Sequence, residues 1–185
     1  ANNLIAGQVD SGSLAFVLST PTKRRKVAVT QMVFMLGSLV LMYLLIGGVG
    51  LLASIFVEGS ISISSGGLMQ LTLGALVTMI AFSGICFLAS AWFNRSKNAM
   101  GVGGGISMFF LVSTILGLFG SKSIPKAMQI EAMNFFNYTS IISFFNVKAI
   151  LEGGTYLWGL LILLAIAAVT YTIGIFKFDR KDLPL

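Results

Sequence analysis

The sequence predicts an all-α fold, a polytopic bundle of transmembrane helices. Of its 185 residues, 56% are hydrophobic and 10% are charged, whereas a soluble domain has about 45–50% apolar and about 25% charged residues. Four stretches without a charged residue each exceed the about 20 residues that a helix needs to cross hydrocarbon. They comprise residues 27–57, 59–94, 98–121 and 153–176. Because these stretches are continuously apolar and lack the alternation of membrane β-strands, we expect them to be helices.

The charges between these stretches set the expected segment boundaries. The four expected transmembrane helices cover residues 27–57, 67–94, 99–120 and 155–176. The other segments are an N-terminal loop at 1–26, short connections at 58–66 and 95–98, a longer segment at 121–154 and a tail at 177–185.

The N-terminal loop contains a candidate amphipathic helix. Ser11 or Ser13 can cap this helix, and Pro21 disfavours the helical state of the residue before it. Three apolar residues fall on one helical face at the i, i+3 and i+4 spacing, namely Leu14, Val17 and Leu18. Such a face can lie on a membrane or fill a groove on a soluble partner. The basic run at 23–26 follows, and we expect it to contact anionic lipid headgroups.

The apolar stretches contain no Asp, Glu, Lys, Arg or His. Carriers driven by an ion gradient usually place such groups near the membrane midplane, so we expect energy for any uphill transport to come from another polypeptide. Gly101 and Gly105 have the spacing that lets two membrane helices approach closely. We interpret them as helix-packing residues, with a hinge in a moving helix as the alternative.

The segment at 121–154 mixes charges with apolar and aromatic residues. It is too interrupted to span a membrane and too apolar for a free loop. We therefore expect re-entrant or interfacial helices at the outer surface, and a folded cap over the bundle is the alternative.

The charge distribution predicts the orientation. The loop 1–26, the turn 95–98 and the tail 177–185 together carry a net charge of +6, whereas the two connections on the other side carry a net charge of zero. Because cytoplasmic loops are enriched in Lys and Arg, we expect both termini to be cytoplasmic. The cations lie at the ends of the spans, so orientation in the membrane accounts for the excess of Lys and Arg, and we expect no nucleic acid as a partner.

Composition excludes several classes of chemistry. The chain has no His and a single Cys, Cys86, so zinc sites, disulfides and Cys–His nucleophile pairs are excluded within it. A phosphate-binding G-x-x-x-x-G-K-[ST] motif is absent. We therefore expect no enzymatic activity and no cofactor bound by this chain.

Three stretches resemble ABC-2 type transporter permeases. The first is the N-terminal run GQVDSGSLAFVLSTPTKR, which is similar to the cytoplasmic loop of that family, with Gln8 where the family often has Glu. The second, FLASAWFNRSK, resembles the turn between the family's fourth and fifth spans. The third, FKFDRKDL, resembles its C-terminal tail. The three stretches span residues 7–24, 87–97 and 176–183.

This resemblance implies a function. The N-terminal run would carry the coupling helix that docks on a separate ABC ATPase subunit, and its matching residues are Gln8, Asp10, Ser13, Leu14, Val17, Leu18 and Pro21. ATP and Mg²⁺ would be bound by that ATPase. A second permease copy or a paralogue, membrane lipid and the cargo would be the other partners. The uncharged spans fit an amphipathic or hydrophobic cargo, such as a peptide, a drug or a lipid, exported across a bacterial cytoplasmic membrane.

The resemblance also implies missing sequence. Members of the family usually have six spans, so the four seen here would be the third to the sixth. The chain begins with Ala, and we expect the first two helices to lie upstream of it. The alternative functions are a non-transport membrane sensor or assembly subunit and, with least support, an intramembrane enzyme.

Overall fold

The computed structural model is all-α in the part of the chain that it describes, which confirms the predicted fold class. It describes residues 5–12, 24–56, 64–120, 129–151, 154 and 156–181. Four long apolar helices have the length and composition of membrane spans. They are α3 (Arg24–Phe56), α4 (Ser65–Trp92), α5 (Ser96–Gly120) and α8 (Leu157–Asp179). At 1.5 Å per residue, even the 23 residues of α8 reach about 35 Å, which exceeds the about 30 Å of a bilayer core.

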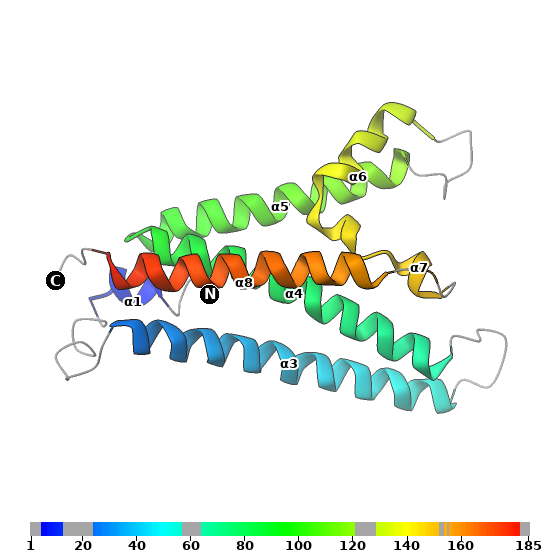
Figure 1. The fold of residues 1–185 in the computed structure, drawn as a ribbon, viewed down its shortest axis with the longest axis horizontal. Helices are drawn as coiled ribbons and strands as arrows, with labels where there is room; N and C mark the ends of the chain where they lie inside the picture. The colour runs from blue at the N-terminus through cyan, green and yellow to red at the C-terminus, as the bar shows by residue number, and fades with distance from the viewer. Residues whose placement is uncertain are drawn as a thin grey trace.

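The long helices run roughly along one axis, and α4 is the central one (Figure 1). It packs against α8 most extensively and also against α3 and α5. Apolar side chains occur around all sides of each helix, so large hydrophobic residues such as Phe34, Leu44 and Phe56 remain exposed. This is the pattern of helices surrounded by lipid, where the backbone bonds internally and side chains need no polar face.

The contact between α4 and α8 is built from small residues and two aromatic rings. Phe87 is 1% exposed, and its ring lies 5.2 Å from the ring of Tyr171. Gly174 admits this ring, because a Cβ atom there would lie 2.8 Å from Cδ1 of Phe87. The Tyr171 hydroxyl also shares a hydrogen bond of 2.7 Å with Ser83 Oγ. Close helix approach and an interhelical hydrogen bond are the main sources of helix association in lipid.

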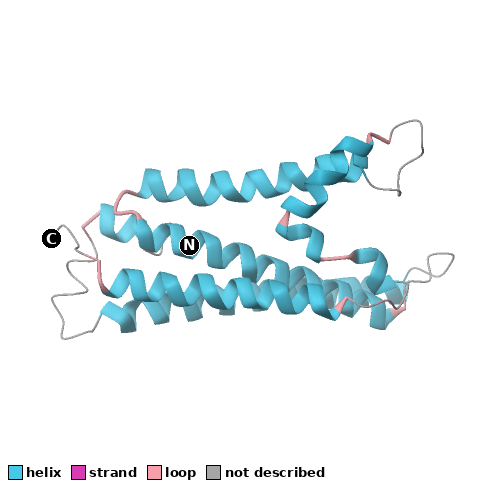
Figure 2. Cartoon of the chain, turned by 45° about the horizontal axis from the view of Figure 1, so that its top comes forward, coloured by secondary structure: helices cyan, strands magenta, loops and turns pink. Residues whose placement is uncertain are grey.

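Short helices connect α5 to α8. These are η3 (Glu131–Asn134), α6 (Phe135–Thr139), η4 (Ile141–Phe144) and α7 (Val147–Leu151), and together we call them the arm. Figure 2, in a turned view, shows the arm at one end of the bundle. No strand occurs among the described residues.

The arm folds back along α5. The amide of Ile130 donates to the carbonyl of Phe119 (2.9 Å), and Asn137 Nδ2 donates to the carbonyl of Gly117 (2.9 Å). Further along, Ser140 Oγ donates to the carbonyl of Phe110 (3.0 Å). The acceptor carbonyls on α5 thus run from Phe119 back to Phe110, nine residues toward the start of the helix, or about 13 Å at the helical rise. The arm therefore covers the side of the bundle instead of extending away from its end.

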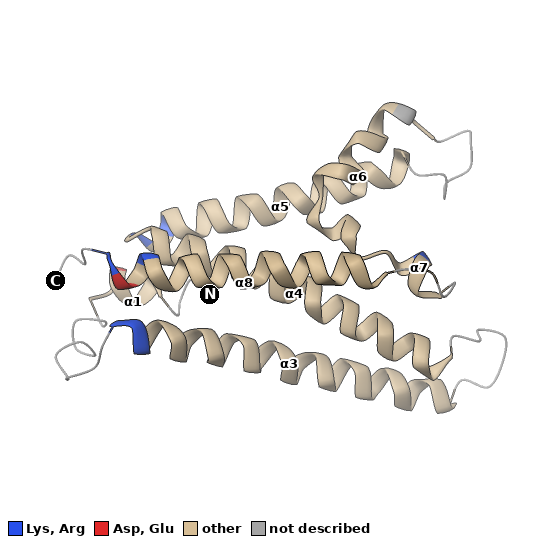
Figure 3. Cartoon of the chain, in the orientation of Figure 1, with Lys and Arg blue, Asp and Glu red and all other residues tan. Residues whose placement is uncertain are grey.

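Most of the charged residues in the described ranges gather at the opposite end (Figure 3). This end comprises α1 (Ala6–Asp10), the start of α3, the turn between α4 and α5 and the end of α8, and we call it the basic end. The described cations there are Arg24, Arg25, Lys26, Arg95, Lys97, Lys177, Arg180 and Lys181, and the described carboxylates are Asp10 and Asp179.

Candidate functional site

The basic end brings together segments that are far apart in the sequence. The short helix α1 lies beside the ends of α3 and α8 (Figure 1) and packs against α5. A five-residue helix such as α1 is too short to be stable alone, so tertiary contacts must hold it.

Apolar side chains of α1 and of Ile5, the residue that precedes it, provide these contacts. Ile5 and Ala6 are 0% exposed, and Val9 is 8% exposed. Ile5 and Val9 belong to the same apolar cluster as Ala28 of α3 and Phe178 of α8, both of which are fully buried. The described segment with Ile5 and α1 is therefore part of the bundle core at this end.

Two polar contacts join α1 to the neighbouring spans. Gln31 Nε2 of α3 donates a hydrogen bond of 2.8 Å to Gln8 Oε1. The backbone N–H of Ser96, at the start of α5, donates to Asp10 Oδ2 at 3.3 Å. A carboxylate at this position satisfies an N–H that the helix leaves without an internal partner and complements the positive end of the helix dipole.

The contact with α3 is incomplete. Gln31 Oε1 is buried and accepts no hydrogen bond from the described residues. A buried acceptor without a donor costs about 1–3 kcal/mol. The hydrogen bond between Gln8 and Gln31 therefore stabilises the contact of α1 with α3 less than a pair in which both polar groups of the Gln31 amide are bonded.

Lys181 ties the end of α8 to the α4–α5 turn. Its ammonium donates to the carbonyls of Ala91 (3.0 Å) and Phe93 (2.7 Å), which lie at the C-terminal end of α4. The side chain is only 8% exposed. Burial lowers the pKa of Lys181 to about 8, and repulsion from Lys177 adds to this shift. At pH 7 the ammonium is still protonated, so it complements the negative end of the α4 dipole.

Arg24 links the same tail to α3, because its Nη1 donates to the carbonyl of Lys181 at 2.8 Å. The Lys177 ammonium lies 4.4 Å from the ring centre of Trp92, a cation–π distance. Basic side chains therefore hold the ends of α3, α4 and α8 in fixed positions relative to one another.

The structure covers two of the seven residues that the resemblance assigns to ATPase coupling. Gln8 contacts α3, and Asp10 is exposed and contacts the start of α5. The other five lie outside the described residues: Ser13, Leu14, Val17, Leu18 and Pro21.

Gly101 and Gly105, interpreted from the sequence as helix-packing residues, meet no other described part of this chain. Both are exposed, and a Cβ atom at either position would meet nothing within 4 Å. The glycine that packs is Gly103, where a Cβ atom would lie 3.3 Å from the Ala89 Cβ and 3.5 Å from the Cys86 Cα. Gly103 thus lies on the face of α5 that packs against α4, and the helix-packing role of Gly101 and Gly105 stays a prediction.

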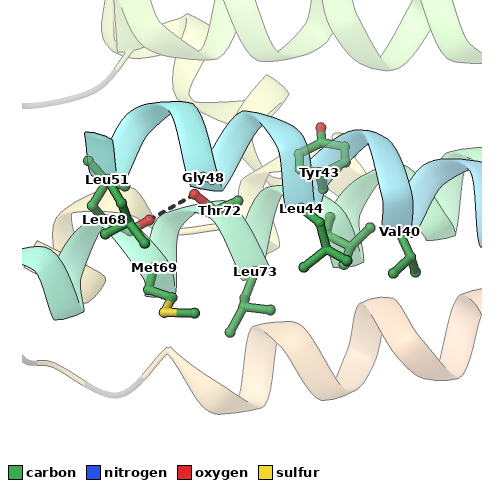
Figure 4. A pocket seen from close by; sticks show the side chains of 11 residues that line it. Val40, Tyr43, Leu44, Gly48, Leu51, Leu68, Met69, Thr72 and Leu73 are labelled. Atoms are coloured by element: carbon green, nitrogen blue, oxygen red, sulfur yellow. Dashed lines mark hydrogen bonds between the residues drawn. The ribbon is translucent and has the colours of Figure 1, made fainter. Parts of the chain in front are cut away.

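An apolar cleft opens between α3 and α4 (Figure 4). Its volume is about 360 Å³, and its lining includes Val40, Leu44, Leu68 and Leu73. Gly47 brings the two helices together there, since a Cβ atom would lie 3.2 Å from Thr72 Cγ2. The hydroxyl of Thr72 donates to the carbonyl of Leu68 in its own helix (2.9 Å). Consequently the cleft offers a predominantly apolar surface.

No group of three or more metal-ligating side chains occurs among the described residues.

Comparison with known proteins gives the decisive observation. A family model described as ABC-2 family transporter protein matches residues 1–183, which is nearly the whole chain. The chain belongs to the ABC-2 transporter family. Searches of curated proteins and of solved structures found no match.

Membership makes the chain a multi-pass membrane permease of the ABC transporter type, and such permeases associate in general with an ABC ATPase. In this ABC-2 permease, sequence reasoning missed Lys181 and Gly103 as structural residues. A lysine next to a charged tail gives no sign of burial. A glycine inside a glycine-rich helix gives no sign of which face is covered.

Proposed function

We propose that this ABC-2 permease is the transmembrane subunit of an ATP-binding cassette exporter that moves an amphipathic or hydrophobic cargo, such as a peptide, a drug or a lipid. ATP and Mg²⁺ bind to a separate ATPase subunit, whose hydrolysis drives transport. The observation that carries this proposal is the family match over residues 1–183. A second copy of the permease, or a paralogue, completes the transport path.

The charge distribution supports a cytoplasmic position for the basic end. The described cations of that end outnumber its carboxylates by eight to two, and cytoplasmic segments are enriched in Lys and Arg. Both termini are then cytoplasmic, and α1 lies on the side where an ATPase docks. In a bacterium this membrane is the cytoplasmic membrane.

The contacts of α1 support a route for the coupling movement. An ATPase that displaces the loop after α1 pulls on a helix that is joined to α3 through Gln8 and Gln31 and to α5 through Asp10 and Ser96. The buried side chains of Ile5 and Val9 add a contact with the cluster that includes α8. One displacement therefore acts on three spans together.

The apolar character of the spans supports the cargo class. The four charge-free stretches contain no Asp, Glu, Lys, Arg or His, and the cleft between α3 and α4 is lined mainly by aliphatic side chains. A site of this kind favours apolar surface over a polar ion, because an ion would lose hydration without gaining a partner.

The test is reconstitution of the protein with its cognate ABC ATPase in proteoliposomes. Peptides, hydrophobic dyes and fluorescent lipids are supplied on the side of the ATPase, and ATP-dependent movement to the other side is measured. At least one class should move with ATP and not with an ATPase variant that cannot hydrolyse it.

A membrane sensor or assembly subunit gives a different result. It binds the ATPase and alters its rate without moving any cargo class. Hydrolysis that no cargo class stimulates, together with no movement of any of them, would contradict the exporter proposal.

A further inference from the structure

A second cleft lies at the basic end, between the α4–α5 turn and the end of α8. Its volume is about 490 Å³, within the about 300–1,000 Å³ of small-molecule sites. We call it the Trp92 cleft. Of the eight described residues that line it, four are cationic and none is acidic. The cationic ones are Arg95, Lys177, Arg180 and Lys181.

Two of these cations are held in place. The Lys181 ammonium donates to two backbone carbonyls and is almost fully buried, which leaves one of its three N–H groups for a further acceptor. The Lys177 ammonium lies over the Trp92 ring. A ligand that accepts hydrogen bonds from these groups meets them already ordered, and preorganised donors reduce the entropic cost of binding.

Among the described lining residues, the cations of the cleft also have no acidic partner. Asp10 accepts from the start of α5, and Asp179 is exposed and does not line the cleft. The repulsion between Lys177 and Lys181, which contributes to the lowered pKa of Lys181, is the consequence of this crowding. An anion in the cleft relieves that repulsion.

The position of the cleft indicates where the anion comes from. Trp92 ends α4 and is 52% exposed, and tryptophan is enriched at the level of lipid headgroups. Lys177 and Arg180 lie at the end of α8, directly after its apolar run. The cleft is therefore at the depth of the phosphate layer of the basic side. Basic clefts between transmembrane helices at this depth bind anionic headgroups.

We propose that the Trp92 cleft binds the phosphate group of an anionic phospholipid, with Arg180 and Arg95 as the exposed donors and Lys177 and Lys181 as the fixed cations. An arginine guanidinium suits this role because it donates two parallel hydrogen bonds to a phosphate. The basic run at the start of α3 differs from this site. It attracts an anionic surface as a whole, whereas the cleft holds one headgroup.

Trp92 provides the probe for the test. The chain has two tryptophans, so Trp158→Phe leaves Trp92 as the single fluorophore. A phosphate bound beside Lys177 changes the electric field at the Trp92 ring and therefore the emission of Trp92. The full chain in detergent micelles is titrated with phosphatidylglycerol, with phosphatidylcholine, and with inorganic phosphate or glycerol 3-phosphate. Phosphatidylglycerol should give a saturable change, and the other three should not at the same concentrations.

Matched variants separate the cleft from general attraction. Arg180→Gln should raise the dissociation constant for phosphatidylglycerol by about tenfold, since a charge-assisted bidentate contact is lost. Arg25→Gln removes the same charge from an exposed position at the start of α3 and should leave the constant within about twofold. Arg95→Gln serves as a second cleft variant, and circular dichroism verifies the helical content of each.

Four results would overturn the proposal. The first is an equal response to phosphatidylcholine, and the second is an equal loss in Arg25→Gln and the two cleft variants. The third is saturation by inorganic phosphate or glycerol 3-phosphate, which would make the site one for a soluble phosphate. The fourth is a response that disappears when the cognate ATPase is bound, which would make the cleft a protein contact.

Discussion

Replacement of Ile5 by Ala tests whether α1 acts as part of the bundle. Ile5 is fully buried in the cluster that joins α1 to α3 and α8. Truncation of a buried Ile to Ala costs about 2–5 kcal/mol in protein cores. When α1 detaches, its apolar side chains meet water at the end of the bundle, so the transfer part of this cost applies here in full.

This magnitude sets the size of the expected effect. Even about 2 kcal/mol shifts the balance between docked and detached α1 by about 30-fold. A helix of five residues has little stability of its own, so the detached segment unfolds. Its backbone amides then lose the hydrogen bonds that they make in the docked state, such as the bond from the Val9 amide to the Ile5 carbonyl (3.1 Å).

Hydrogen exchange measured by mass spectrometry detects this change. In Ile5→Ala, the amides of α1 should exchange at least about tenfold faster, while those in the middle of α4 keep their rates. In the reconstituted complex, cargo-stimulated ATP hydrolysis should fall toward the basal rate. The matched control is Ile55→Ala, the same truncation at a position that is 70% exposed, and it should change neither measurement.

Unchanged exchange in Ile5→Ala, within the error of the wild type, would refute the claim that tertiary burial holds α1. Faster exchange with full cargo stimulation would leave the fold intact and refute the coupling route through α1.

The contacts of the basic end and of α5 lead to three further predictions. In a double-mutant cycle measured by thermal unfolding in detergent, Gln8→Leu should destabilise the protein, because Nε2 of Gln31 then loses its acceptor while Oε1 of Gln31 already lacks a donor. Adding Gln31→Leu should recover part of that loss, because it removes this incompletely bonded amide. The pKa of Lys181 lies near 8 in the folded protein and near 10.4 in an unfolded chain, so the unfolded state binds more protons between these two pH values. The melting temperature should therefore rise with pH across that window, and Lys181→Met should remove the rise. In a denaturant titration, Gly103→Leu should lower the free energy of unfolding by about 1–3 kcal/mol, because the new side chain overpacks against α4. Gly101→Leu should leave it unchanged, and equal losses in the two variants would contradict the assignment of Gly103 as the glycine that packs against α4.

The N-terminal run was informative in part, and its role in ATPase coupling stays a prediction. The motif in the N-terminal run points to Gln8 and Asp10 from sequence alone, because the resemblance depends on the order of residue types along the chain. What those side chains contact was not predictable. Gln31 and Ser96 lie far from them in the sequence, and a single Gln or Ser in an apolar chain carries no signal of its partner.

The amino-acid sequence alone determined that the chain is a helical membrane protein and where its long helices lie. These features depend on the length of apolar runs, which must match the bilayer, and on the absence of water to satisfy an open backbone. The clustering of Lys and Arg between alternate spans likewise predicted one basic end, since charges are excluded from the hydrocarbon region.

Only the tertiary structure decided which face of each helix is covered. In a soluble helix an apolar stripe marks the buried face, but α5 is apolar on all sides, so Gly101, Gly103 and Gly105 look equivalent in the sequence. Their environments differ only because the Ala89 side of α4 packs against Gly103. The burial of Lys181 has the same origin: its ammonium is ordered by the carbonyls at the end of α4, which it meets only when α4 and α8 pack together. In lipid, close packing and matched hydrogen bonds select the helix interfaces, and neither can be inferred from the hydrophobicity of the sequence.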